Sequence, residues 1–169
     1  MTAVEFHTDV GDVLDFSCRL LRKAYRQGTR VAVIAPANTL AALDRALWTF
    51  ADREFVPHAL VVEGTQDSEP ARRAPIWLID NMALPGAPDI LVNVGFELAE
   101  SLQPPEPLQA LQAFRRLIEV VSLDVDDAAR ARARWRHYRS LGLEVKHHRA
   151  SAEAADLPSY ELGAGPGQN

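Results

Sequence analysis

The sequence predicts an α/β fold, a Rossmann-like layered sheet of mostly parallel strands with helices on both faces. Two observations support this fold class. Short runs of β-branched and other apolar residues, typical of strands covered on both faces, recur along the chain. These runs alternate with helix-length amphipathic stretches, an order that favours parallel strands joined by right-handed crossovers. The 169 residues are enough for one domain with a substantial core.

The first half of the chain is expected to contain two strands and two helices. A strand begins at residues 4–7, and a helix follows from 12 to about 27. Gly28 is placed to end this helix, because glycine adopts the left-handed conformation at little cost. A buried strand is predicted at 30–35, and a second helix starts at Pro36. The inward face of the first helix is predicted to carry Val13, Leu14, Cys18, Leu21 and Tyr25.

The second half is expected to add further strands and helices around polar connections. Strands are predicted at 59–62, 75–80, 89–94, 118–122 and 143–147. Helices are predicted at 108–117 and 124–140, with a polar loop at 63–73. A Pro85-Gly86 turn joins the strands on either side of it. The α/β domain therefore covers residues 1–149, and residues 150–169, rich in Ala, Gly, Ser and Pro, are expected to form a flexible C-terminal tail.

The composition limits the class of function. The formal net charge of −5 argues against a nonspecific nucleic-acid coat protein, but it permits a local basic patch. The one cysteine, Cys18, excludes an intrachain disulfide and fits a reducing cytosol; on the inward helix face it is expected to be a buried structural thiol. The start of the chain has no signal-peptide pattern, and the apolar runs are short. We therefore expect a cytoplasmic protein without membrane contact.

Residues 41–58 form the most distinctive stretch of the sequence. Its first part continues a helix whose apolar face includes Leu43 and Leu47, and Pro57 requires this helix to end before Val56. Trp48 points away from the apolar face in this register. An aromatic residue off the core face, followed by Phe55, Val56 and Pro57 on a loop, indicates an apolar patch available to a partner.

A second distinctive stretch lies in the last predicted helix, where five arginines, a tryptophan and a tyrosine occur between Arg130 and Arg139. Helical spacing places one set on a single face: Arg132, Trp135, Arg136 and Arg139. Guanidinium groups around an indole can receive a short acidic segment that carries an aromatic or carboxylate end. Two alternatives remain open: a solvated face paired with Asp124, Asp126 and Asp127 around a core Trp135, or direct phosphate binding by the helix.

The sequence offers little support for catalysis. The first strand-to-helix turn, 8–12, lacks the glycines of a dinucleotide site and the Gly-Lys-Ser/Thr pattern of a Walker loop, and its acids would repel phosphate. His147 and His148 would face opposite ways on a strand. His58 is interpreted as a hydrogen-bonded loop residue, and Asp126-Asp127 as complements of a helix start. We expect no catalytic residue, metal or cofactor, and a nucleotide-handling enzyme is kept as an alternative.

The pattern Leu43-Asp44…Leu47-Trp48…Phe55-Val56-Pro57-His58 resembles the chi subunit family of bacterial DNA polymerase III. A second match surrounds Trp135, and the resemblance extends over about residues 1–149. It implies an α/β accessory subunit of the clamp-loader complex without catalytic residues of its own. Such a subunit would link the polymerase to single-stranded DNA-binding protein (SSB) during DNA replication, and would contact DNA only indirectly.

The resemblance also implies two binding surfaces. In the family, the last helix is associated with the acidic C-terminal tail of SSB, which ends in acids and Pro-Phe; the corresponding residues here are Arg132, Trp135, Arg136, Arg139 and Val121. The surface for the psi subunit corresponds to Trp48, Phe55, Val56 and Pro57. If psi is absent, an XPD-like helicase could use the same patch. A direct single-stranded-DNA binder through the arginine-rich helix is the remaining alternative.

Overall fold

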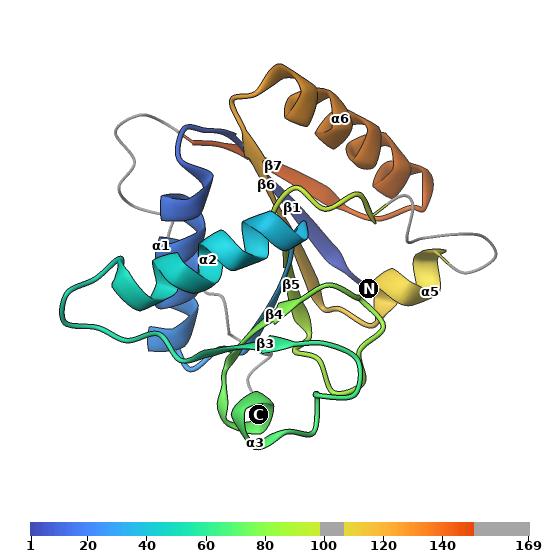
Figure 1. The fold of residues 1–169 in the computed structure, drawn as a ribbon. Coiled ribbons are helices and arrows are strands. Elements are labelled where there is room, and N and C mark those ends of the chain that lie inside the picture. Colours follow the sequence, from blue (N-terminus) through green and yellow to red (C-terminus); the bar gives the residue numbers. More distant parts are fainter. Residues whose placement is uncertain (99–106, 151–169) are drawn as a thin grey trace, which may run out of the picture.

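The computed structural model describes residues 1–98 and 107–150, which form one sheet with helices on both faces (Figure 1). All seven strands are parallel, in the order β3-β4-β2-β5-β6-β1-β7, which confirms the predicted α/β class. The strands are β1 (Ala3–Val10), β2 (Val31–Ile34), β3 (His58–Val61), β4 (Ile76–Ile79), β5 (Ile90–Asn93), β6 (Arg116–Ser122) and β7 (Val145–Arg149).

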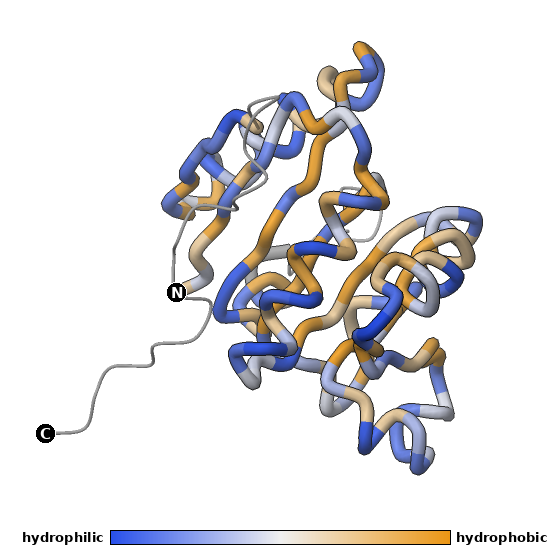
Figure 2. Tube along the Cα trace, turned by 90° about the vertical axis from the view of Figure 1, so that its left-hand side faces the viewer, coloured by the Kyte–Doolittle hydropathy of each residue, from blue (hydrophilic) through white to orange (hydrophobic). Residues whose placement is uncertain are grey.

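The helices divide between the two faces of the sheet. The first two cover one face and three others cover the opposite face; they are α1 (Val13–Arg26), α2 (Ala37–Thr49), α3 (Glu69–Arg73), α5 (Pro107–Gln112) and α6 (Val125–Ser140). Hydrophobic residues are concentrated along the central strands, as expected for strands buried on both sides (Figure 2). No described helix is both long and apolar enough to cross a lipid bilayer.

Helix α1 has the predicted start and end. The Asp12 side chain accepts a hydrogen bond from the Asp15 backbone N–H at 2.9 Å, and Gly28 has a φ of +70° just after the helix. Cys18 is fully buried, and burial raises the pKa of its thiol to about 11, which confirms a structural thiol. The prediction that Tyr25 faces the core was wrong. Its side chain is 41% exposed, because the buried face continues through Ala24.

Several predicted boundaries in the second half were wrong. The helix predicted at 108–117 ends at Gln112, and strand pairing begins at Arg116, which aligns with β1 on one side and β5 on the other. The last strand lies two residues later than expected. The loop at 63–73 contains α3, whose start is capped by the Ser68 side chain. The strands around the Pro85-Gly86 turn do not pair, since β2 lies between them.

A buried polar network holds α6 against the sheet. Glu119 on β6 is fully buried, and its carboxylate accepts hydrogen bonds from the Tyr138 hydroxyl at 2.6 Å and the Arg134 Nε at 3.1 Å. The Asn93 amide donates to the same carboxylate from β5 at 3.1 Å. Burial raises the pKa of Glu119, while Arg134 and the hydrogen-bond donors act in the opposite direction. Each partner of the carboxylate is a donor, so the network stabilises its ionised form.

A second buried group lies on the opposite face of the sheet. His7 on β1 packs between Phe16 and His148, with ring centroids 5.5 and 5.1 Å away. Burial, and then the nearby charges of His148, Arg116 and His147, lower the pKa of His7 to about 4. The imidazole is therefore neutral in the folded protein at neutral pH.

The neutral His7 predicts acid sensitivity of the fold. Below pH 6.5, the ordinary pKa of histidine, the unfolded chain binds a proton that the folded chain excludes until the pH approaches 4. The free energy of unfolding should therefore fall by about 2–3 kcal/mol between pH 7 and pH 4.5 from this group. Urea unfolding at both pH values should show a smaller fall for His7→Phe, which keeps the ring packing. An equal fall in both proteins would contradict this assignment.

The network under α6 predicts a large cost for breaking the ion pair. Arg134→Met leaves the Glu119 carboxylate buried without its cation, and should lower the free energy of unfolding by about 3 kcal/mol. Urea unfolding measures this change, with Arg139→Met, an exposed arginine of the same helix, as the matched control. The double variant Arg134→Met/Glu119→Gln should be more stable than Arg134→Met alone. Equal free energies of unfolding for Arg134→Met and Arg139→Met would show that the Arg134–Glu119 ion pair does not hold α6.

Candidate functional site

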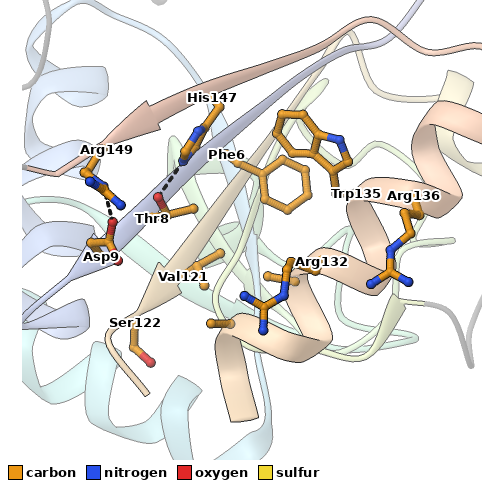
Figure 3. Close-up of a pocket in the computed structure, with 12 residues that line it drawn as sticks. Phe6, Thr8, Asp9, Val121, Ser122, Arg132, Trp135, Arg136, His147 and Arg149 are labelled. Carbon is orange, nitrogen blue, oxygen red and sulfur yellow. Dashed lines mark hydrogen bonds and ion pairs between the residues drawn. The ribbon is translucent and has the colours of Figure 1, made fainter. Parts of the chain in front are cut away.

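A cleft of about 490 Å³ lies between α6 and the carboxyl ends of β6, β1 and β7 (Figure 3). This edge of an open parallel sheet is where α/β proteins commonly bind ligands. The cleft is lined by Phe6, Thr8, Asp9, Val121, Ser122, Ala128, Ala131, Arg132, Trp135, Arg136, His147 and Arg149. Four of the five residues expected to bind the SSB tail lie here. Arg139 is exposed one turn further along α6 and does not line the cleft.

The strands and the helix each contribute by their own periodicity. Successive residues of a strand point to opposite faces, so Phe6 and Thr8 of β1 face α6, while His7 faces α1. The same alternation separates His147, which lines the cleft, from His148, which stacks on His7. The opposite orientation predicted for these two histidines is confirmed.

Trp135 forms an apolar wall of the cleft. The centroid of its ring lies 5.1 Å from that of the Phe6 ring and 5.9 Å from that of the His147 ring. The planes of the Trp135 and His147 rings are nearly perpendicular. The His147 ring is held by a 2.6 Å hydrogen bond between its Nε2 and the Thr8 hydroxyl. Trp135 is half-buried, packed against the core on one side and accessible on the other. Such an indole can cover an aromatic or apolar side chain of a ligand.

Four of the five arginines of α6 fall into two groups. Arg130 and Arg134 form ion pairs, the first with Glu97 at 3.1 Å and the second with Glu119 at 3.1 Å. Arg132 and Arg136 are exposed and have no ion pair within residues 1–98 and 107–150. The cleft therefore offers two free guanidinium groups beside an indole.

The acids at the start of α6 have structural roles. The Asp124 side chain accepts hydrogen bonds from the backbone N–H groups of Asp126 and Asp127, at 3.0 and 2.9 Å. The Asp127 carboxylate accepts from the Ser122 N–H and hydroxyl, both at 2.8 Å. These contacts confirm the interpretation as a helix start. They join α6 to the end of β6, and so fix the mouth of the cleft.

One acid lies inside the cleft. Asp9 has a φ of +58° at the irregular end of β1, and its carboxylate pairs with the Arg149 Nε at 2.6 Å. The pair neutralises Arg149, so the free positive charge is concentrated on α6. A carboxylate at the first strand-to-helix turn disfavours a nucleotide phosphate at that point.

Sequence reasoning missed the part of the cleft that β1 and β7 form. Phe6, Thr8, His147 and Arg149 come from β1 and β7, which are adjacent in space but far apart in the chain. The signal available was the alternation of each strand. It could not identify the cleft without the register that aligns Phe6 with His147 and Thr8 with Arg149.

The other distinctive stretch, residues 41–58, forms a separate surface beside α2. The exposed rings of Trp48 and Phe55 stack with centroids 4.7 Å apart, and the Trp48 and His58 centroids are 5.4 Å apart. The His58 ring nitrogens are hydrogen-bonded to the Val56 carbonyl at 2.8 Å and the Asp44 carboxylate at 2.9 Å. The histidine was expected to be hydrogen-bonded, which is confirmed. It supports the two aromatic rings.

The exposed members of this surface differ from those expected. Trp48 is 59% exposed and Phe55 48%, but Val56 is fully buried in the core and Pro57 is half-buried. Leu60, which lies two residues after His58 and on the same face of edge strand β3, is 59% exposed. We call Trp48, Phe55 and Leu60 the apolar patch. The buried side chain of Val56 attaches the loop to the core, and the third exposed apolar residue of the surface is Leu60 instead of Val56.

Comparisons with known proteins identify the family. Residues 1–146 match the family model described as "DNA polymerase III chi subunit, HolC". A relative from Pseudomonas aeruginosa named DNA polymerase III subunit chi is 32% identical over 154 residues, which cover 88% of this chain and 97% of the relative. A protein from Rickettsia prowazekii named probable DNA polymerase III subunit chi is 26% identical over 120 residues, 70% of this chain and 68% of that protein. The chain belongs to the DNA polymerase III chi subunit family.

Proposed function

We propose that this chain is a noncatalytic, cytoplasmic adaptor of the DNA polymerase III clamp-loader complex. Its cleft binds the acidic C-terminal tail of SSB, and its apolar patch binds the psi subunit or another protein that takes its place, such as an XPD-like helicase. The observation that carries the proposal is the pair of free guanidinium groups, Arg132 and Arg136, beside the half-buried indole of Trp135. Family membership provides the assembly in which such an adaptor would act.

The cleft suits a peptide end that combines negative charge with an aromatic ring. Arginine pairs with carboxylates through two parallel hydrogen bonds, so Arg132 and Arg136 can hold acidic residues or a terminal carboxylate. Trp135, backed by Phe6, offers a flat apolar surface for the aromatic ring. Val121 of β6 adds an apolar side chain to the lining of the cleft. No covalent step is required of any of these groups.

The two surfaces allow the chain to act as a tether. The cleft is on the α6 face, at the β7 side of the sheet, and the apolar patch lies beside α2 and the opposite edge strand, β3. Both partners can therefore bind at once without competing for space. A protein held to SSB on coated single strands raises the effective concentration of whatever its other surface carries.

The arginine contacts predict a specific loss of peptide affinity. Arg136→Ala should weaken binding of a synthetic Asp-Asp-Asp-Ile-Pro-Phe peptide about tenfold, because a hydrogen bond to a charged group contributes about 1.5 kcal/mol. Arg139→Ala is the matched control: it has the same charge on the same helix, outside the cleft, and should change the affinity little. Isothermal titration at low and high salt measures both effects, and binding should weaken as salt rises.

Three results of that titration would contradict the proposal: equal loss in both variants, salt-insensitive binding, or no binding by the parent. A labelled oligothymidine in a parallel anisotropy experiment tests direct DNA binding. Arginines beside an accessible indole could also bind single-stranded DNA. Oligonucleotide binding that is tighter than peptide binding and is lost in Arg136→Ala would favour that function instead.

The apolar patch predicts a separate partner interaction. Trp48→Ser/Leu60→Ser should weaken association with a psi-containing clamp-loader complex at least tenfold, because central aromatic residues commonly contribute about 2 kcal/mol or more to an interface. Tyr25→Ser, at another exposed aromatic on α1, is the control. Surface plasmon resonance with immobilised complex measures the affinity. Peptide binding at the cleft should be unchanged in the double variant. Undiminished binding to the complex would rule out the patch as this interface.

A further inference from the structure

The last described residue, Ala150, directly follows Arg149, which lines the cleft, and its own side chain packs against the core on the α1 side of the sheet. Thr8, which is paired with Arg149 between β1 and β7, also lines the cleft. The Ala150 backbone N–H donates a 2.9 Å hydrogen bond to the Thr8 carbonyl, which continues the pairing of β7 with β1. The segment that follows is therefore joined to the chain two residues after Arg149, a side chain of the proposed peptide-binding site.

The sequence that follows has the composition of a ligand for this site. Residues 151–169 contain three acids, Glu153, Asp156 and Glu161, and no lysine, arginine or histidine. Within them, Asp156-Leu157-Pro158-Ser159-Tyr160 places an acid, an apolar residue, a proline and an aromatic ring in close succession. Free arginines beside an indole recognise this combination of negative charge and aromatic surface.

We infer that segment 151–169 binds the cleft of its own chain. Asp156 pairs with the free guanidinium groups of Arg132 and Arg136, and Tyr160 packs against Trp135. The segment thereby competes with any acidic peptide supplied by another protein. The inferred competition with a peptide of another protein rests on the proposed function of the cleft. The inferred binding of segment 151–169 to the cleft does not rest on it.

The distances permit this contact. Trp135 lies 5.9 Å from His147, which precedes Ala150 by three residues, about 10 Å along a strand. The stretch from Ser151 to Asp156 can span about 20 Å when extended, enough to turn back into the cleft. A short connection also gives a tethered ligand an effective concentration of about millimolar, so that even weak contacts with the cleft are occupied.

The charges of the described cleft favour the same occupant. Asp9 is already paired with Arg149, so the cations available to an acidic segment are those of α6. The rings of Phe6 and His147 fix the position of the indole from behind, leaving its accessible side for a second aromatic ring. A proline before the aromatic residue reduces the conformational freedom that is lost on binding.

The first test observes the cleft directly in the full chain. With tryptophan labelled by ¹⁵N, the Trp135 indole resonance is assigned from the Trp135→Phe variant. The motif variant Asp156→Asn/Tyr160→Ser should shift this resonance. The matched control Glu161→Gln/Leu162→Ser removes one acid and one apolar residue just outside the motif, and should leave the resonance in place. The shift should be independent of protein concentration.

The second test measures competition, with the labelled Asp-Asp-Asp-Ile-Pro-Phe peptide as the probe. The motif variant should bind the probe several-fold more tightly than the parent, and the control variant should bind like the parent. An unmoved Trp135 resonance together with equal probe affinity overturns the inference and leaves the proposed function standing. If the motif variant shifts the Trp135 resonance while neither it nor the parent binds the probe, that result supports occupation of the cleft by the segment and contradicts the proposed function.

Two further outcomes also overturn the inference. Equal effects of the motif and control variants would mean that diffuse charge, and not the Asp156–Tyr160 motif, contacts the cleft. A Trp135 resonance that shifts with protein concentration would assign the occupant to a second copy of the chain.

Discussion

Burial of the Glu119 carboxylate beneath α6 is the constraint on which the position of the cleft depends. A buried charge is costly unless it is paired and hydrogen-bonded, so α6 must place Arg134 and Tyr138 over this point of β6. These two residues lie one helical turn apart, and together they fix both the height and the rotation of the helix. Trp135 then lies at the side of α6, above Phe6, and the neighbouring arginines remain outside the network. One ion pair in the core thus separates the structural arginines of α6 from those available to a ligand.

The two faces of the sheet have different roles because successive side chains of a strand point to opposite faces. On β1, β6 and β7, one set of side chains builds the cleft under α6, and the other set packs toward α1, where His7 is kept neutral. The apolar patch beside edge strand β3 uses a different device: a hydrogen-bonded histidine supports two stacked rings that remain in solvent. Both surfaces are therefore held by polar contacts beneath them, which keeps exposed aromatic groups in fixed positions.

Much of the fold could be predicted from the sequence because its signals are local. The β-branched runs identified the strands, and Asp12, Gly28 and Asp124 marked helix ends that the structure confirms. The errors came where tertiary context decides: strand pairing starts at Arg116 inside a helical pattern, and Val56 turns into the core from a loop. The α6 side of the cleft followed from helical spacing, whereas its strand side required a register between distant segments. The buried network had one signal in the sequence: Glu119 is a single acid within the apolar run 117–121.

The strand order has a consequence for how the chain is made. Among the described strands β1 is synthesised before the others, yet its neighbours in the sheet are β6 and β7, the last two in sequence order. Both edges of β1 therefore stay unpaired until residues 116–149 have been made, and its contacts join residues far apart in sequence, a feature associated with slow folding. A nascent chain that stalls before residue 145 leaves one edge of β1 without its partner strand, and an unpaired strand edge can associate with other molecules.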